Sequence, residues 1–186
     1  MMIFSRLKTC MVVLTIVGFS QFGRAEILTS VNYFQYSKDE KINVGTNTET
    51  RITSYDFSLQ FIMGSSFLVG ATQMTQTSSS GDVRGHRESF APNIGFLLGP
   101  FLLEGGPISK STEKADLNEA KEWREGKGYY ASICLLDRVS SWLLIGFQFT
   151  FIDIEYKKYF DGINESADQK KNVSVLSPSI RLSVLF

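Results

Sequence analysis

The sequence predicts an all-β fold, an eight-stranded antiparallel up-and-down transmembrane β-barrel, on two observations. Apolar and polar residues alternate along several stretches of the chain, with the period of two that identifies a strand rather than a helix. Short and long polar links then alternate between these stretches. A membrane barrel with tight turns at one end and long loops at the other has this pattern of links.

Four stretches alternate clearly. In Tyr55–Phe61 (YDFSLQF), four apolar residues share one face and Asp56, Ser58 and Gln60 share the other. Each stretch is therefore predicted to be a strand with one apolar face. The other three clear stretches are Ser89–Leu98, Trp142–Phe151 (WLLIGFQFTF) and the final Ser177–Phe186 (SPSIRLSVLF).

Four weaker stretches bring the count of predicted strands to eight. They alternate less clearly, and in the first of them the two faces are hard to tell apart; they are Leu28–Ser37, Phe67–Gln76, Phe101–Ser109 and Gly128–Leu136. The longest apolar run, Ile94–Leu103, contains glycine and proline and is about half the ~20 residues that a membrane-spanning helix needs. A helical membrane protein is therefore excluded after the N-terminal segment.

The predicted links fall into two classes. Tight turns are expected at 64–66, 99–100 and 137–141, and long polar loops at 38–50, 77–88, 110–127 and 156–172. The segment 113–125 (EKADLNEAKEWRE) is rich in helix formers and predicts a short surface helix. Pro92, Pro107 and Pro178 fall toward the loop-side ends of their predicted strands, where a ladder can lose a hydrogen-bond donor.

The N-terminus has the layout of a signal peptide. Arg6 and Lys8 precede a short apolar stretch, and Gly23 and Ala25 suit a cleavage site before Glu26. The apolar stretch is too short to span a membrane as a helix. We therefore expect residues 1–25 to be cleaved and residues 26–186 to form one barrel domain, with a retained N-terminal helix as the alternative.

Charge and cysteine content exclude several functions. All nineteen acidic residues follow Ala25, whereas three of the nineteen basic residues precede it, so the processed chain carries a net charge of −3. Because no basic stripe is present to neutralise phosphates, nucleic acid is not expected as a partner. Cys134 is the one cysteine after Ala25, which excludes an internal disulfide and a cysteine-based metal site. We expect no cofactor.

The chain resembles the small eight-stranded outer membrane β-barrels, a group with opacity-type adhesins, OmpA-like transmembrane domains and OmpW-like proteins. Their C-terminal insertion signal has a polar residue, a glycine two positions later, and apolar or aromatic residues at alternate positions to the end. Ser179, Val184 and Phe186 match this signal, whereas Arg181 stands where the group often has glycine.

This resemblance implies a location and partners. It places the chain in the outer membrane of a Gram-negative bacterium, with both termini periplasmic. The implied partners are outer membrane lipid or lipopolysaccharide, the barrel-assembly machinery during insertion, and a surface ligand.

Two charged residues are expected inside the barrel. If the apolar faces contact lipid, Glu104 and Arg181 point inward, because an arginine on the lipid side costs about 2–4 kcal/mol near mid-membrane. The lumen of an eight-stranded barrel is only wide enough for side chains to fill it. We therefore expect Glu104 and Arg181 to share one polar network with Gln60 and Gln148. A structural plug is favoured over a conduction path, since buried charges need partners in any case.

An enzyme is not expected. The single histidine, His86, lies in the stretch GHRES, where a neighbouring glutamate and serine suggest a catalytic triad. Consecutive residues of an extended segment point apart, however, and the His-x-Ser pattern of the lipid A deacylases among these barrels is absent. We interpret His86 as a solvated residue and predict no catalytic residues.

The favoured function is a structural or surface-interaction role through four long extracellular loops. The first alternative is a narrow channel for small or apolar solutes, which the OmpW-like proteins are thought to be. Less favoured are a barrel enzyme that acts on lipid and a soluble lipocalin-like binder. A lipocalin would need an apolar interior and a Gly-x-Trp opening, and neither Trp123 nor Trp142 has that context.

Overall fold

The computed structural model describes residues 26–41, 47–64, 66–80, 83–114, 121–166 and 169–186, so the predicted signal peptide lies outside the described residues. All regular elements among these residues are strands, and turns or irregular segments join them. The strands are β1 (Glu26–Lys41), β2 (Asn47–Met63), β3 (Phe67–Ser80), β4 (Val83–Leu98), β5 (Phe101–Lys114), β6 (Glu122–Arg138), β7 (Leu143–Tyr156), β8 (Lys158–Phe160), β9 (Glu165–Ser166) and β10 (Lys171–Leu185). Among the described residues, no helix is long and apolar enough to cross a membrane.

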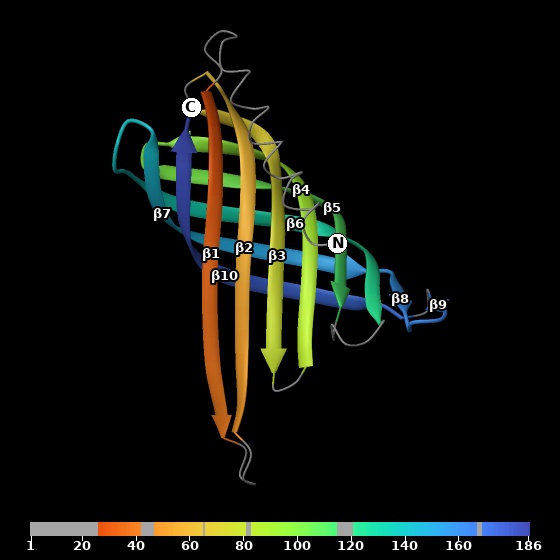
Figure 1. The fold of residues 1–186 in the computed structure, drawn as a ribbon. Coiled ribbons are helices and arrows are strands. Elements are labelled where there is room, and N and C mark those ends of the chain that lie inside the picture. Colours follow the sequence, from red (N-terminus) through yellow and green to blue (C-terminus); the bar gives the residue numbers. More distant parts are fainter. Residues whose placement is uncertain (1–25, 42–46, 65, 81–82, 115–120, 167–168) are drawn as a thin grey trace, which may run out of the picture.

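Eight of these strands close into one antiparallel barrel (Figure 1). Each strand from β1 to β6 pairs with the next, β7 pairs with β10, and β10 also pairs with β1 to close the circle. In Figure 1, β1 to β4 run along the near side while β6 and β7 cross behind them. The predicted fold class, an eight-stranded up-and-down barrel, is therefore confirmed.

The two ends of the barrel differ. At one end, which we call the turn end, Ile27 and Phe186 exchange backbone hydrogen bonds of 2.9 and 3.1 Å. The three tight links lie at the same end, and Gly64 and Gly99 supply the left-handed backbone conformation that two of these turns need. We call the opposite end, where β1 meets β2 and β7 leads to β10, the loop end.

The strands are longer than the sequence predicted. The β1–β2 ladder continues until Lys41 faces Asn47, and the β3–β4 ladder until Ser80 faces Val83. The prediction of long loops at 38–50 and 77–88 was therefore wrong. Apolar alternation marks only the part of a strand that faces lipid, whereas backbone pairing continues through Ser- and Thr-rich segments that lack it.

The remaining two predicted loops also contain strands. Glu113 and Lys114 end β5 and Glu122 begins β6, so the predicted helix over 113–125 is wrong at both ends, and residues 115–120 lie outside the described residues. The predicted loop 156–172 contains β8 and β9; β8 pairs with the loop-end extension of β6, and β9 pairs with β8.

The prolines of β4 and β5 lie in mid-strand, not near the strand ends as predicted. Pairing between β4 and β5 is regular up to Phe90 opposite Lys110 and resumes at Ile94 opposite Gly105. Pro92 and Pro107 lie in the interrupted part. A proline has no N–H to donate to a ladder, which accounts for a break in this wall of the barrel.

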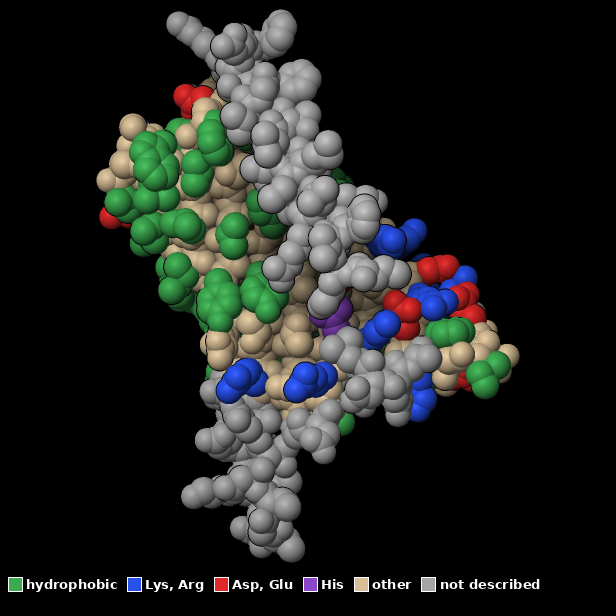
Figure 2. Space-filling view, in the orientation of Figure 1, with side chains coloured by type: hydrophobic (Ala, Val, Ile, Leu, Met, Phe, Trp, Pro, Cys, Tyr) green, Lys and Arg blue, Asp and Glu red, His purple; other side chains and the backbone are tan. Residues whose placement is uncertain are grey.

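The outer surface carries an apolar belt. Side chains that alternate along the strands are exposed on the outside, including Phe57, Phe61, Ile94, Phe96, Leu103, Ile133, Phe147, Phe149, Ile180 and Leu182. Aromatic pairs lie near its loop-end border (Tyr33–Tyr55 and Tyr129–Phe151), and Phe67–Phe96 lies near the turn end. Figure 2 shows hydrophobic side chains covering the turn-end part of the near face, and charged side chains gathered around β8 and β9.

The belt has the height of a membrane core. Along β7 it runs from Leu143 to Phe151, about 30 Å of strand at ~3.3 Å per residue. At the tilt of ~40° common in membrane barrels, this is about 23 Å along the barrel axis, close to the ~25 Å apolar band of such barrels. The exterior is therefore that of a transmembrane barrel.

A charge placed in the belt is expected to destabilise the protein in lipid vesicles. Phe147 is 50% exposed on the belt, and the Phe147→Arg variant should lose about 2–4 kcal/mol of unfolding free energy by denaturant titration in vesicles. Ile163→Arg, at an 87% exposed residue beyond β8, is the matched control and should change stability by less than about 0.5 kcal/mol. Equal losses for the two variants would show that Phe147 does not face lipid.

Candidate functional site

The centre of the lumen is organised around Arg181. Its side chain on β10 is fully buried, although the neighbouring Ile180 and Leu182 are exposed on the belt. The alternation of the strand therefore sends the guanidinium inward at the depth of the membrane. There it forms an ion pair with the buried carboxylate of Glu104 on β5, with 2.7 Å between Nη1 and Oε1.

The other partners of Arg181 come from three further strands and from β10 itself. Nη1 also donates to Oε1 of Gln148 on β7, at 2.8 Å. Nη2 donates to Oγ of Ser30 on β1 at 2.9 Å and to Oε1 of Gln60 on β2 at 3.2 Å. Nε donates to Oγ of Ser183 at 3.2 Å. Every nitrogen of the guanidinium thus has an acceptor, which a buried charge requires.

Glu104 also has several hydrogen-bond partners. Besides Arg181, its carboxylate accepts hydrogen bonds from Nε2 of Gln60 at 2.8 Å and from Oγ of Ser132 at 3.1 Å. The structure thus brings Glu104, Arg181, Gln60 and Gln148 into contact. We call these four residues with Ser30, Ser132 and Ser183 the central network.

Sequence reasoning missed the three serines. Ser132 and Ser183 alternate with lipid-facing residues, so their inward direction could have been read from the pattern. Ser30 lies in a stretch whose two faces were hard to tell apart, and the sequence gives no signal for it. Two further hydrogen bonds extend from the network. Nε2 of Gln60 donates to Oδ1 of Asn93 at 3.4 Å, and Nδ2 of Asn93 donates to Oγ1 of Thr72 at 2.7 Å.

An apolar layer closes the turn end of the lumen. It consists of buried side chains packed against one another, with three partly buried leucines beside them: Leu28, Ile62, Leu68, Leu102, Cys134 and Leu136, with Leu97, Leu144 and Leu185. Leu68, Leu102 and Cys134 are fully buried. We call this set the turn-end seal. It lies between the central network and the end of the barrel, where it excludes water from the ion pair.

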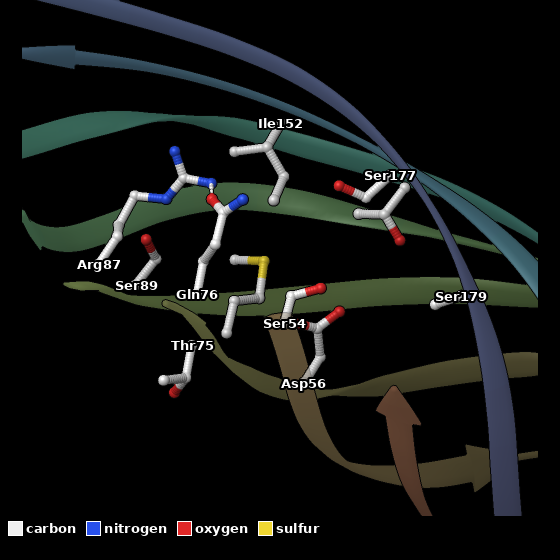
Figure 3. Close-up of a pocket in the computed structure, with 11 residues that line it drawn as sticks. Ser54, Asp56, Thr75, Gln76, Arg87, Ser89, Ile152, Ser177 and Ser179 are labelled. Atoms are coloured by element: carbon white, nitrogen blue, oxygen red, sulfur yellow. Dashed lines mark hydrogen bonds between the residues drawn. The ribbon is translucent and has the colours of Figure 1, made fainter. Parts of the chain in front are cut away.

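The loop-end half of the lumen is only partly filled. One side is apolar and consists of Met74, Ala91, Ile108, Tyr130, Ile152, Ile154 and Tyr156. Beside it lies a small cavity whose lining includes Ser54, Asp56, Ser89, Ser177 and Ser179 (Figure 3). Arg87 also lines it and donates a hydrogen bond to Gln76, drawn as a dashed line in Figure 3.

The residues of the predicted insertion signal do not form one site. Ser179 points into the lumen and is 7% exposed, and its Oγ has no hydrogen-bond partner among the described residues. Val184 and Phe186 have the opposite parity on β10 and face outward, with Phe186 at the turn end.

His86 and Ser89 cannot act together. On β4, His86 shares the outer face with Glu88, and its Nε2 lies 3.0 Å from Oε1 of that glutamate. Ser89 points into the lumen, where its Oγ lies 2.8 Å from Oγ of Ser111. The alternation of the strand therefore separates Ser89 from His86 and Glu88. Among the described residues, no group of three or more His, Cys, Asp or Glu side chains could hold a metal ion.

Beyond the barrel, the β8–β9 hairpin is held by ion pairs. Lys158 lies 2.7 Å from Glu125 of β6 and 2.8 Å from Glu165 of β9. These hydrogen bonds raise the pKa of Lys158, and its ammonium lowers the pKa of Glu165 below the ordinary value. Trp123 also packs against Tyr159, with the rings tilted and 4.8 Å between their centroids. The hairpin is therefore fixed to β6.

Comparison with known proteins finds similarity of fold. No protein-family model matches the sequence. No curated protein matches it. The outer membrane protein AlkL, solved in DMPC lipid bilayers, is 9% identical over 90% of this chain and 92% of its own, with a TM-score of 0.49. OprG from Pseudomonas aeruginosa is 11% identical over 87% of this chain and 96% of its own (TM-score 0.47). At these values the likeness concerns the barrel fold alone.

Loss of the Glu104 charge is expected to destabilise the barrel strongly. The Glu104→Gln variant keeps the size of the side chain but leaves the Arg181 guanidinium buried without its counter-ion, which costs about 3–5 kcal/mol. Denaturant titration in vesicles should show this loss. Asp137→Asn, at an exposed residue near the turn end, removes the same charge as a control and should change stability by less than about 0.5 kcal/mol. An unchanged Glu104→Gln protein would show that the ion pair does not stabilise the fold.

Proposed function

We propose that the chain is an outer membrane β-barrel with a closed lumen and that it acts through its loop-end surface. The apolar belt supports a place in a bilayer, because an apolar exterior of this height would be exposed to water in a soluble protein. A closed barrel can span an outer membrane because every backbone donor and acceptor in the belt can be paired between strands.

The proposed orientation has both termini in the periplasm. The tight links at 64–66, 99–100 and 139–142 support it, since short turns face the periplasm in such barrels. The proposal includes cleavage of residues 1–25 by a signal peptidase. It also includes recognition of Ser179, Val184 and Phe186 by the barrel-assembly machinery during insertion.

The observation that carries the closed lumen is the turn-end seal with the central network above it. Leu68, Leu102 and Arg181 are fully buried, and the guanidinium has acceptors on all three nitrogens. An ion would have to displace both layers to cross. This arrangement favours a structural and surface-interaction role over conduction, and the separation of His86 from Ser89 gives no support to catalysis.

Because the belt faces lipid and the lumen is closed in this proposal, the loop-end surface is the part of the barrel that can contact a partner outside the membrane. The strands extend beyond the belt, and β8 and β9 add a rigid edge there with Trp123, Tyr159 and paired charges. We propose that this surface contacts a partner outside the cell.

Planar-bilayer recording is the test of the closed lumen. The reconstituted protein should give no steady single-channel steps, because the seal and the network block the path. Because the seal remains, the variant Glu104→Ala with Arg181→Ala should also give no steps, whereas adding Leu68→Ala and Leu102→Ala removes the fully buried leucines of the seal and should give steps. Steady steps from the unmodified protein would overturn the closed lumen.

A second candidate function is entry of small apolar solutes through the wall. The observation that favours it is a groove on the lipid side of the break between β4 and β5. Its lining includes Pro92, Ile94, Leu103, Pro107 and Ala131, and it reaches Asn93 and Glu104 of the lumen. A solute could then enter from the membrane without passing the turn-end seal.

Filling the groove tests this second function. In vesicles carrying the protein, Ala131→Trp should lower the uptake of a small apolar fluorescent probe several-fold, because the indole occupies the groove. Thr29→Trp, on β1 away from the groove, should leave uptake unchanged. Equal uptake by vesicles with and without the unmodified protein would exclude this function.

A further inference from the structure

A polar groove lies on the barrel between the loop-end parts of β5 and β6. Its lining residues come from both strands and include Lys110, Thr112, Arg124 and Lys127. The remaining lining residues are Ser109, Ser111, Glu125 and Gly126. We call it the β5–β6 groove. It belongs neither to the lumen nor to the β4–β5 groove described above.

An irregular register produces the groove. The β5–β6 ladder is regular up to Ile108 opposite Gly128, then passes to Ser111 opposite Gly126 and to Glu113 opposite Trp123. Glu125 has a φ of 53°, in the left-handed region that non-glycine residues rarely adopt. Two shifts within a few residues separate the strands locally, and such bulges often redirect side chains at functional positions.

The basic residues of the groove differ in whether they have an ion-pair partner. Arg124 is paired with Glu122 at 3.0 Å and with Glu165 at 3.5 Å, and the one acidic lining residue, Glu125, is taken up by Lys158. Lys110 and Lys127 have no ion-pair partner within the part of the chain that the structure describes. Both are exposed, and both line the same groove.

The acidic residues of β7 beside the groove form no ion pair with Lys110 or Lys127. Glu155 on β7 faces Lys127 across the ladder, but the two side chains form no ion pair. Asp153, next along β7, accepts a hydrogen bond from Ser174 instead. Two lysines that form no ion pair among the described residues thus line one groove.

The groove lies at the border of the apolar belt. Lys127 is two residues from Tyr129 on the outer face of β6, and Tyr129 pairs with Phe151 at the loop-end edge of the belt. Lys110 faces the exposed Phe90 of β4 in the ladder. In a bilayer, cations at this height meet the head groups, and anionic head groups attract them.

We propose that the β5–β6 groove binds the phosphate of an anionic membrane lipid, with Lys110 and Lys127 as its ligands. The proposal rests on the proposed membrane location but not on the closed lumen. Lysine is a common phosphate ligand, and the hydroxyl group of Thr112 is a further donor in the lining. The lipid phosphate replaces the missing counter-charge, and its acyl chains lie along the belt below Tyr129.

Native mass spectrometry of the protein in detergent tests the site, with diphosphorylated lipid A as the probe. The unmodified protein should retain one lipid A molecule. Lys110→Gln with Lys127→Gln should weaken binding about thirtyfold, since each basic residue at a membrane surface contributes about fivefold. Lys157→Gln with Lys170→Gln removes two exposed loop-end charges outside the groove and should leave the affinity unchanged.

Two further arms identify the ligand. Lipid A from which both phosphates have been removed should bind as weakly as lipid A binds to the double groove variant. Inorganic phosphate should not displace lipid A at equal concentration. Displacement would assign the site to free phosphate and overturn the lipid, and equal weakening in both double variants would show only a general effect of charge.

Vesicle flotation separates this proposal from the proposed function. If the unmodified protein fails to float with vesicles, the membrane location itself is wrong. If it floats and the groove variant still binds lipid A as tightly as the unmodified protein, the lipid site alone is wrong.

Discussion

The ion pair between Arg181 and Glu104 is the interaction on which the rest of the barrel depends. The two residues belong to β10 and β5, which are not neighbours in the sheet, and their charges meet across the lumen. A one-residue slip of either strand would turn its charge toward lipid and its apolar residues toward the lumen. Pairing therefore fixes which face of each strand is inside, and with it the composition of the belt.

The other layers follow from burying this pair. An ion pair in a water-poor lumen is tolerated only if all remaining donors and acceptors are satisfied. Gln60, Gln148 and the three serines of the central network provide those bonds, and the turn-end seal keeps water away on one side. The loop-end half, with its cavity and its wall break at Pro92 and Pro107, is filled less completely. The central network thus lies between the turn-end seal and this loop-end half.

The sequence was informative where lipid imposes a pattern. Arg181 and Glu104 could be placed in the lumen because each lies between apolar neighbours and neither can face lipid at low cost. Outside the membrane that constraint disappears, so the lengths of β1 to β4 and the existence of β8 and β9 could not be predicted from alternation. The same holds for the β5–β6 groove, because a register shift depends on how two strands pair and leaves no mark in either strand alone. The sequence contains Pro92 and Pro107, but it does not show that both lie at the same break in the barrel wall.

A double-mutant cycle on Arg181 and Glu104 tests the central role of the ion pair most directly. Unfolding free energies in vesicles would be measured for Arg181→Met, Glu104→Gln and the double variant. Because each single variant leaves one buried charge alone, the double variant should be more stable than the sum of the two losses predicts, with a coupling energy of about 2–3 kcal/mol. Losses that add within about 0.5 kcal/mol would contradict the account, since the two charges would then stabilise the barrel independently.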